Sequence, residues 1–156
     1  KNYKQVVKSV ETSKEWPENL GVGKPYDNMI DNRLEDYLEA KAAAGQGDSR
    51  KTSALLAAVA DYTISRSHFE SGNLLSALAL RESGKVQEAD HMVAAWSTDF
   101  PENRVVQWCT AIYRGEKEKA VGMLQSRNDQ TNTTPWEASF RDSNFDLIVR
   151  LFSTEQ

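Results

Sequence analysis

The chain has 156 residues, of which 39% are hydrophobic and 27% charged, and this length suits one domain with a sizeable buried core. Its formal net charge of −4 comes from interspersed acidic and basic residues without a basic block, which argues against nucleic acid as a partner. The single cysteine, Cys109, excludes an intramolecular disulfide and a four-thiolate metal site within one chain.

The cellular location follows only loosely from these features. One cysteine is compatible with a reducing compartment, and we favour the cytoplasm although the sequence leaves the location open. The longest apolar run, residues 54–60 (ALLAAVA), is far shorter than the roughly 20 residues that a membrane span needs, so we expect no membrane span. Because a helix is already under way at residue 1, we expect residues 1–156 to be a single helical domain from a longer chain.

The first predicted helix covers residues 3–14 and ends at Trp16-Pro17, because proline disfavours helical geometry in the residue before it. Residues 20–26 (LGVGKPY) follow as an irregular connection. They superficially resemble a phosphate-binding loop, but the spacing is wrong and Pro25 stands where Ser or Thr would ligate magnesium. A turn-rich linker is the better interpretation.

Two helices are predicted next. Asp27 can cap a helix that runs to about Ala44, and residues 45–48 turn the chain into a second helix from about Ser49 to Ser65. Nearly all side chains in the middle of this second helix are apolar, so we expect neighbouring helices to enclose it.

The clearest helical hairpin spans residues 70–103. Apolar residues recur at helical spacing over residues 74–80 and again over residues 86–96, with Gly84 between them, and Phe100-Pro101 ends the second helix.

The rest of the chain predicts one more hairpin and a terminal helix. The hairpin covers residues 103–125 and turns at Gly115. After a polar loop, residues 134–137 (TPWE) have the form of a capping box, and a fresh cap near Asp142-Ser143 could break the last helix. As a terminal element this helix can cover the exposed end of a helical stack.

The order of helix, glycine turn and second helix resembles the tetratricopeptide repeat. The turn residues Gly47, Gly84 and Gly115 are separated by 37 (84−47) and 31 (115−84) residues, an average equal to that family's period of about 34 residues. Small residues at Ala77 and Ala89 would let the two helices of the central hairpin approach closely.

The resemblance implies an all-α fold. It would be a short right-handed α-α superhelix (solenoid) of about three tetratricopeptide-like helical hairpins, with partial capping helices at both ends. An aromatic-Pro-Glu-Asn phrase at residues 16–19 returns at residues 100–103, which is consistent with a repeated corner between hairpins.

In tetratricopeptide arrays, the first helix of each hairpin lines a concave groove. Transferring the repeat positions puts Tyr37, Lys41, Arg81 and Tyr113 on this face as binding candidates, because aromatic and basic side chains suit an extended peptide. The aliphatic residues on the same face are better explained as core. The resemblance thus implies a non-enzymatic module that binds a protein or peptide partner.

Two alternatives remain open. Residues 16–24 (WPENLGVGK), followed by a helical hairpin, are similar to the C-terminal helical regions of large bacterial proteins with a β-rich N-terminal part. That similarity implies an accessory domain of a carbohydrate-active or carbohydrate-binding protein, whose partner is the N-terminal domain of its own chain. A stand-alone enzyme would need a deep pocket that holds His68 or His91 with a carboxylate, and we expect no such pocket.

We expect no catalytic residues, metal ligands or cofactor. His68 and His91 are not spaced to place two ligands on one helix face. Cys109 stands between Trp108 and Ile112, so we interpret it as a small buried hydrophobe and not as a nucleophile.

Overall fold

The structure is a computed structural model that describes residues 3–15, 30–64, 69–128, 142 and 144–153. These residues form α1 (Tyr3–Lys14), α2 (Arg33–Gln46), α3 (Ser49–Ile64), α4 (Gly72–Glu82), α5 (Val86–Asp99), α6 (Arg104–Arg114), α7 (Lys117–Asn128) and α8 (Phe145–Ser153). No strand occurs among them, which confirms the all-α fold class.

The structure bears on two helix starts that the sequence predicts, one near Asp27 and one at residues 134–137. Helix α2 begins at Arg33, because Asp31 turns the chain there by accepting a hydrogen bond from the Arg33 backbone N–H at 3.1 Å. The proposed cap Asp27 and the capping box at residues 134–137 lie outside the described residues. The last described helix starts after Asp142, whose Oδ1 accepts the Asn144 N–H at 3.1 Å.

The three turn glycines adopt the same left-handed backbone conformation, with φ angles of 81°, 82° and 75° at Gly47, Gly84 and Gly115. At each, the residue after the glycine donates its N–H to the carbonyl five residues earlier, which is the Schellman way of ending a helix. These bonds are Asp48 to Ala43 at 3.0 Å, Lys85 to Leu80 at 2.9 Å and Glu116 to Ala111 at 2.8 Å. The repeated glycines therefore mark turns of one geometry.

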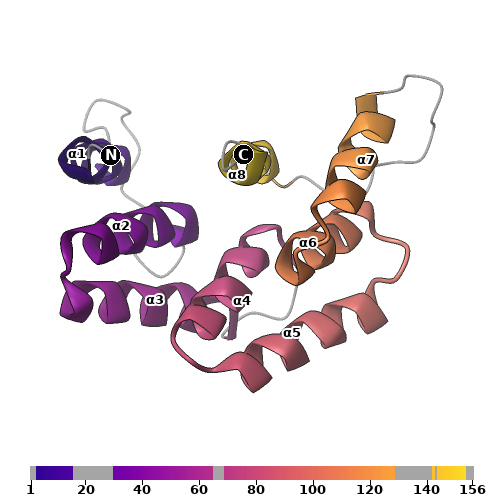
Figure 1. Cartoon of the computed structure of the whole chain (residues 1–156), viewed down its shortest axis with the longest axis horizontal. Coiled ribbons are helices and arrows are strands. Elements are labelled where there is room, and N and C mark those ends of the chain that lie inside the picture. Colours follow the sequence, from indigo (N-terminus) through magenta and orange to yellow (C-terminus); the bar gives the residue numbers. More distant parts are fainter. Residues whose placement is uncertain (1–2, 16–29, 65–68, 129–141, 143, 154–156) are drawn as a thin grey trace.

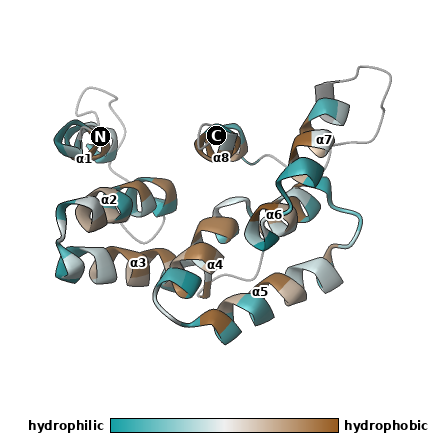
Figure 2. Ribbon diagram, viewed as in Figure 1, coloured by the Kyte–Doolittle hydropathy of each residue, from teal (hydrophilic) through white to brown (hydrophobic). Residues whose placement is uncertain are grey.

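Consecutive helices pack against each other from α1 to α7, and α2 and α6 also contact α4. Figure 1 shows α2, α4 and α6 in the middle of the molecule, with α3 and α5 on one side and α1 and α8 on the other. Helix α4 is the centre of the core, since every residue from Ser71 to Leu80 is buried. Hydrophobic residues are accordingly dense along α4 and α8 (Figure 2).

Helix α3 is less enclosed than its sequence predicts. Leu56, Val59 and Ala60 are buried, but Ala54 and Ala57 are exposed, so the expectation that neighbours enclose the whole apolar middle of this helix is wrong. Alanine exposes little apolar area and is the best helix former, so an alanine-rich surface is tolerated.

A buried arginine joins the start of α2 to the end of α3 and the start of α4. Arg33 is 2% exposed, and all five of its guanidinium N–H groups have acceptors. The acceptors are both Asp31 carboxylate oxygens at 2.9 and 2.8 Å, Thr63 Oγ1 at 2.8 Å, Asn73 Oδ1 at 2.6 Å and Glu70 Oε2 at 2.5 Å. Gly72 leaves the space for this group, since a Cβ there would lie 2.6 Å from the guanidinium carbon.

Within the described ranges, none of the helices combines the length and the apolarity needed to cross a membrane.

Candidate functional site

Three of the four sequence-predicted binding residues line one cavity. Tyr37 and Lys41 come from α2 and Arg81 from α4, and the cavity has a volume of about 430 Å³. Val6 of α1 and Phe152 of α8 add apolar surface from the opposite side. We call this space the groove cavity.

A carboxylate that the sequence reasoning missed organises the polar side of the groove cavity. Glu82 Oε1 accepts the Tyr37 hydroxyl at 2.7 Å, and both its oxygens lie 3.2 Å from Lys41 Nζ. Tyr37 is only 5% exposed, whereas the Lys41 side chain is 50% exposed, so the lysine forms the outer edge of this group. One sequence signal could have indicated Glu82: an acidic residue at the C-terminal end of a helix opposes the helix dipole and needs a compensating cation.

Arg81 and Tyr113 form a second polar group beside the cavity. Arg81 Nη1 donates to the Tyr113 carbonyl oxygen at 2.8 Å, and the guanidinium carbon lies 4.7 Å from the centre of the Tyr113 ring. The Tyr113 hydroxyl donates to Asp90 of α5 at 2.7 Å. Burial, followed by the bond to Asp90, raises the pKa of Tyr113 to about 12. Tyr113 thus supports Arg81 but is not among the residues that line the groove cavity.

Helix α8 covers the face of α4 and α6 beside this cavity. The Phe145 and Trp108 rings meet edge to face at 5.3 Å, and Ile148 is fully buried. The sequence predicted that the terminal helix covers the end of a stack; instead, α8 reaches from Trp108 of α6 to the cavity that Tyr37 lines.

Cys109 lies fully buried in α6. Burial, with a smaller contribution from the Asp142 carboxylate, raises the pKa of its thiol well above the ordinary value. A protonated, buried thiol is a poor nucleophile. His91 is exposed on α5 and is not among the residues that line the groove cavity, and His68 lies outside the described residues.

Among the side chains that the structure describes, no three His, Cys, Asp or Glu residues are grouped as a metal site would require.

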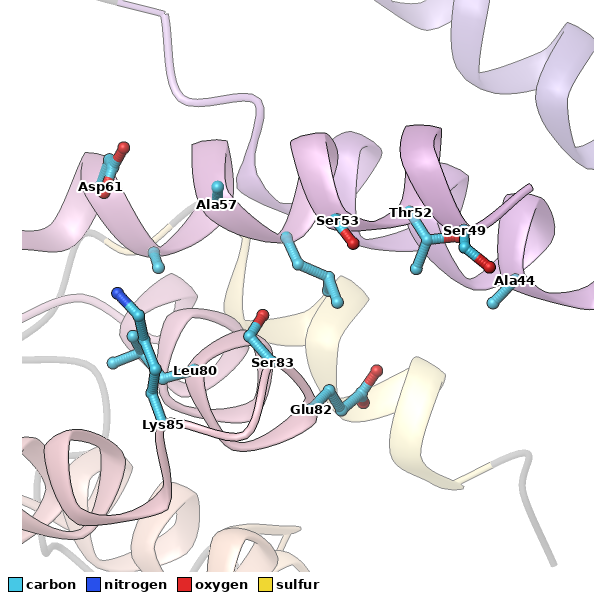
Figure 3. A pocket seen from close by; sticks show the side chains of 12 residues that line it. Ala44, Ser49, Thr52, Ser53, Ala57, Asp61, Leu80, Glu82, Ser83 and Lys85 are labelled. Carbon is cyan, nitrogen blue, oxygen red and sulfur yellow. The ribbon is translucent and has the colours of Figure 1, made fainter. Parts of the chain in front are cut away.

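A second cavity of about 460 Å³ lies between α3 and the turn that joins α4 to α5. Figure 3 shows Ser83 and Lys85 pointing from this turn toward α3, where Ser53 and Ala57 lie. Its walls are small or polar side chains over a floor that includes Leu56. The residues that line this cavity include no aromatic side chain, in contrast to the groove cavity, although Glu82 lines both cavities. We use this cavity as the comparison surface.

In comparisons with known proteins, no family model, no curated protein and no solved structure matches the chain.

Proposed function

We propose that the chain is a non-enzymatic interaction module, in which tetratricopeptide-like helical hairpins form a short solenoid and bind a protein or peptide partner. The observation that carries this proposal is the groove cavity, because Tyr37, Lys41 and Arg81 were chosen from repeat positions and share it. Tyr37 and Lys41 share a face of α2 by their spacing alone, so the support for the repeat register comes from Arg81 of α4, which lines the same cavity.

The packing pattern supports the solenoid part of the proposal. Helices α2, α4 and α6 follow one another across the molecule, with contacts between α2 and α4 and between α4 and α6. The helices that follow them in each pair, α3, α5 and α7, are reached through three glycine turns of one geometry. A repeated unit that stacks on its neighbours accounts for both features.

The side chains of the groove cavity favour a ligand with an apolar residue next to a carboxylate. Val6 and Leu78 offer apolar surface, while Lys41 and Arg81 offer positive charge at the edge. Glu82 already compensates part of that charge, so a ligand carboxylate would share the cations with it.

The test compares the wild-type chain with Lys41→Glu and Lys85→Glu variants. Each variant reverses one exposed lysine, at the groove cavity and at the comparison cavity respectively. Each immobilised chain captures partners from cells that express it, and a captured protein is then purified and titrated calorimetrically. Lys41→Glu places a second negative charge beside Glu82, so we expect it to weaken the affinity by about tenfold or more.

The Lys85→Glu variant should bind the same purified partner as the wild type does. Circular dichroism must first show equal helicity for the three chains. Equal affinity of the wild type and Lys41→Glu for every purified partner would contradict the proposal.

A further inference from the structure

Helix α8 has the side-chain pattern of a groove-bound ligand. Phe145, Ile148, Val149 and Phe152 stand at positions i, i+3, i+4 and i+7, which is one face of a helix. Phe145 and Ile148 are buried, and Val149 and Phe152 pack against the core. The buried face of the helix meets Trp108 of α6 through Phe145, whereas Leu147, outside this face, is 48% exposed.

The start of α8 is anchored by one carboxylate. Asp142 Oδ2 accepts the Ser71 backbone N–H at 2.5 Å, just before α4, while its Oδ1 accepts the Asn144 N–H at 3.1 Å. Asp142 thereby joins the N-terminal ends of α4 and α8, where helix dipoles favour negative charge. This anchor and the contact between Phe145 and Trp108 hold the first turn of the helix.

The other end of α8 fits less tightly. Leu151 and Phe152 are only partly buried, and they border the groove cavity of about 430 Å³. Lys41 and Arg81 lie on the same cavity. A carboxylate at this end of a bound helix would lie beside these two cations, and a larger apolar side chain would fill more of the cavity.

From this arrangement we propose that the face formed by α2, α4 and α6 is a helix-binding groove that α8 occupies in cis. Its ligand is an amphipathic helix of another protein, with an acidic N-cap, apolar residues at i, i+3, i+4 and i+7, and a carboxylate near the last of them. The ligand binds by replacing α8. This inference rests on the proposed function, because it specifies the partner of the same surface.

Replacement of α8 can be measured, because a separate helix and α8 compete for the same groove. The covalently attached α8 acts at a high effective concentration, so a separate helix competes poorly with it until α8 is weakened. Phe145→Ala weakens α8 by removing the ring that meets Trp108, and Asp142→Ala is a second variant that removes the anchor instead.

Cys109 provides the readout, since it is the sole cysteine and is completely buried close to Asp142. We expect iodoacetamide to reach Cys109 only when the structure opens around it, so its alkylation rate should increase when α8 leaves the groove, in addition to a contribution from global unfolding. The probe ligand is a synthetic peptide of residues 142–153, and the control peptide carries Ile148→Asp.

In the full chain, we expect Phe145→Ala and Asp142→Ala each to raise the Cys109 alkylation rate by about tenfold or more. Excess wild-type peptide should return that rate to near the wild-type value, and the Ile148→Asp peptide should leave it unchanged. Val93→Ala on α5 controls for general destabilisation, because alkylation through global unfolding should not respond to the peptide.

The proposal is overturned if neither α8 variant raises the alkylation rate with helicity intact, or if both peptides act alike. It is equally overturned if the wild-type peptide fails to slow alkylation of the variants. In each case the proposed function stands when Lys41→Glu still weakens binding of a purified partner. Conversely, equal partner affinity for wild type and Lys41→Glu would contradict the proposed function, and peptide protection would then still support replacement of α8 by a separate helix.

Discussion

Gly72 has a steric role that its neighbourhood makes testable. A Cβ at this position would lie 2.6 Å from the Arg33 guanidinium carbon, so the Gly72→Ala variant must displace a group whose donors are all paired. We expect a loss of roughly 1–3 kcal/mol in unfolding free energy, the usual range for overpacking. Urea denaturation followed by circular dichroism measures this loss.

Gly122 of α7 supplies the matched control. No atom lies within 4 Å of a Cβ built there, and the residue is exposed in a helix. Gly122→Ala should therefore stabilise the chain by up to about 1 kcal/mol through helix propensity. Equal effects of the two substitutions would contradict the steric role of Gly72.

The raised pKa of Tyr113 predicts that the folded chain loses stability at alkaline pH. Its pKa is raised to about 12 by burial and then by Asp90, while an unfolded tyrosine ionises near pH 10. Protonation is thus favoured in the folded chain, so the stabilisation is complete below about pH 10 and is lost as the pH rises toward 12. Absorbance at 295 nm should show a late-titrating component in the native wild type that is absent from Tyr113→Phe. A wild-type titration in which all tyrosines ionise together near pH 10 would argue against the raised pKa of Tyr113.

At the scale of elements, Glu39 of α2 links three helices. Its carboxylate lies 2.8 Å from Lys14 of α1 and 2.7 Å from Lys51 of α3, and the Glu39 side chain is 8% exposed. Burial alone would raise the pKa of Glu39, but the hydrogen bonds from both lysines outweigh it and hold the pKa below its ordinary value. The ionised form of Glu39 is therefore the one that stabilises the packing of α1 and α3 on α2.

The pH dependence of this link follows from the lowered pKa. The stabilisation is fully present above the unfolded-state pKa of about 4.3 and is lost as the pH falls through the folded-state value. We expect Glu39→Gln to cost about 1–2 kcal/mol at pH 7, a figure discounted because Lys51 is partly exposed, and to cost less at pH 3, since protonation of Glu39 removes the stabilisation. Urea denaturation at both pH values measures the difference.

Glu88→Gln is the control for Glu39→Gln. Glu88 pairs with Lys85 at 3.7 Å, but both side chains are more than half exposed. A loss at pH 7 no larger than that of this control would show that Glu39 does not link the helices.

Across the whole molecule, the sequence predicts the structural features that depend only on residues close together in the chain. The helices, and the turns at Gly47, Gly84 and Gly115, follow from local spacing and from the conformational freedom of glycine, and the structure has them. Tyr37 and Lys41 are four residues apart on one helix, so their shared face is also a local property.

Tertiary placement could not be predicted in this way. The apolar stripe of α8 indicates that the helix must be covered, but not which surface covers it. Arg33 resembles a surface residue in sequence, because its acceptors Thr63 and Asn73 are 30 and 40 residues away. The position of α8 and the burial of Arg33 both depend on contacts between segments far apart in the chain, and the spacing of apolar residues does not predict such contacts.

The burial pattern predicts an order of local stability across the molecule. Helix α4 is buried from Gly72 to Leu80 and contacts α2, α3, α5 and α6, whereas Val10 is the one buried residue of the described part of α1. Amide hydrogens of α4 should thus exchange through global unfolding, and those of α1 and α8 through local opening at lower free energy. Hydrogen exchange followed by mass spectrometry should show protection in α4 exceeding that in α1 and α8 by about a hundredfold or more.

Phe145→Ala should accelerate exchange in α8 while leaving α4 protected, because α4 keeps its contacts with four other helices. Equal protection of α4 and α8 would mean that α8 leaves only when the whole chain unfolds, and a helix in trans could not then replace it.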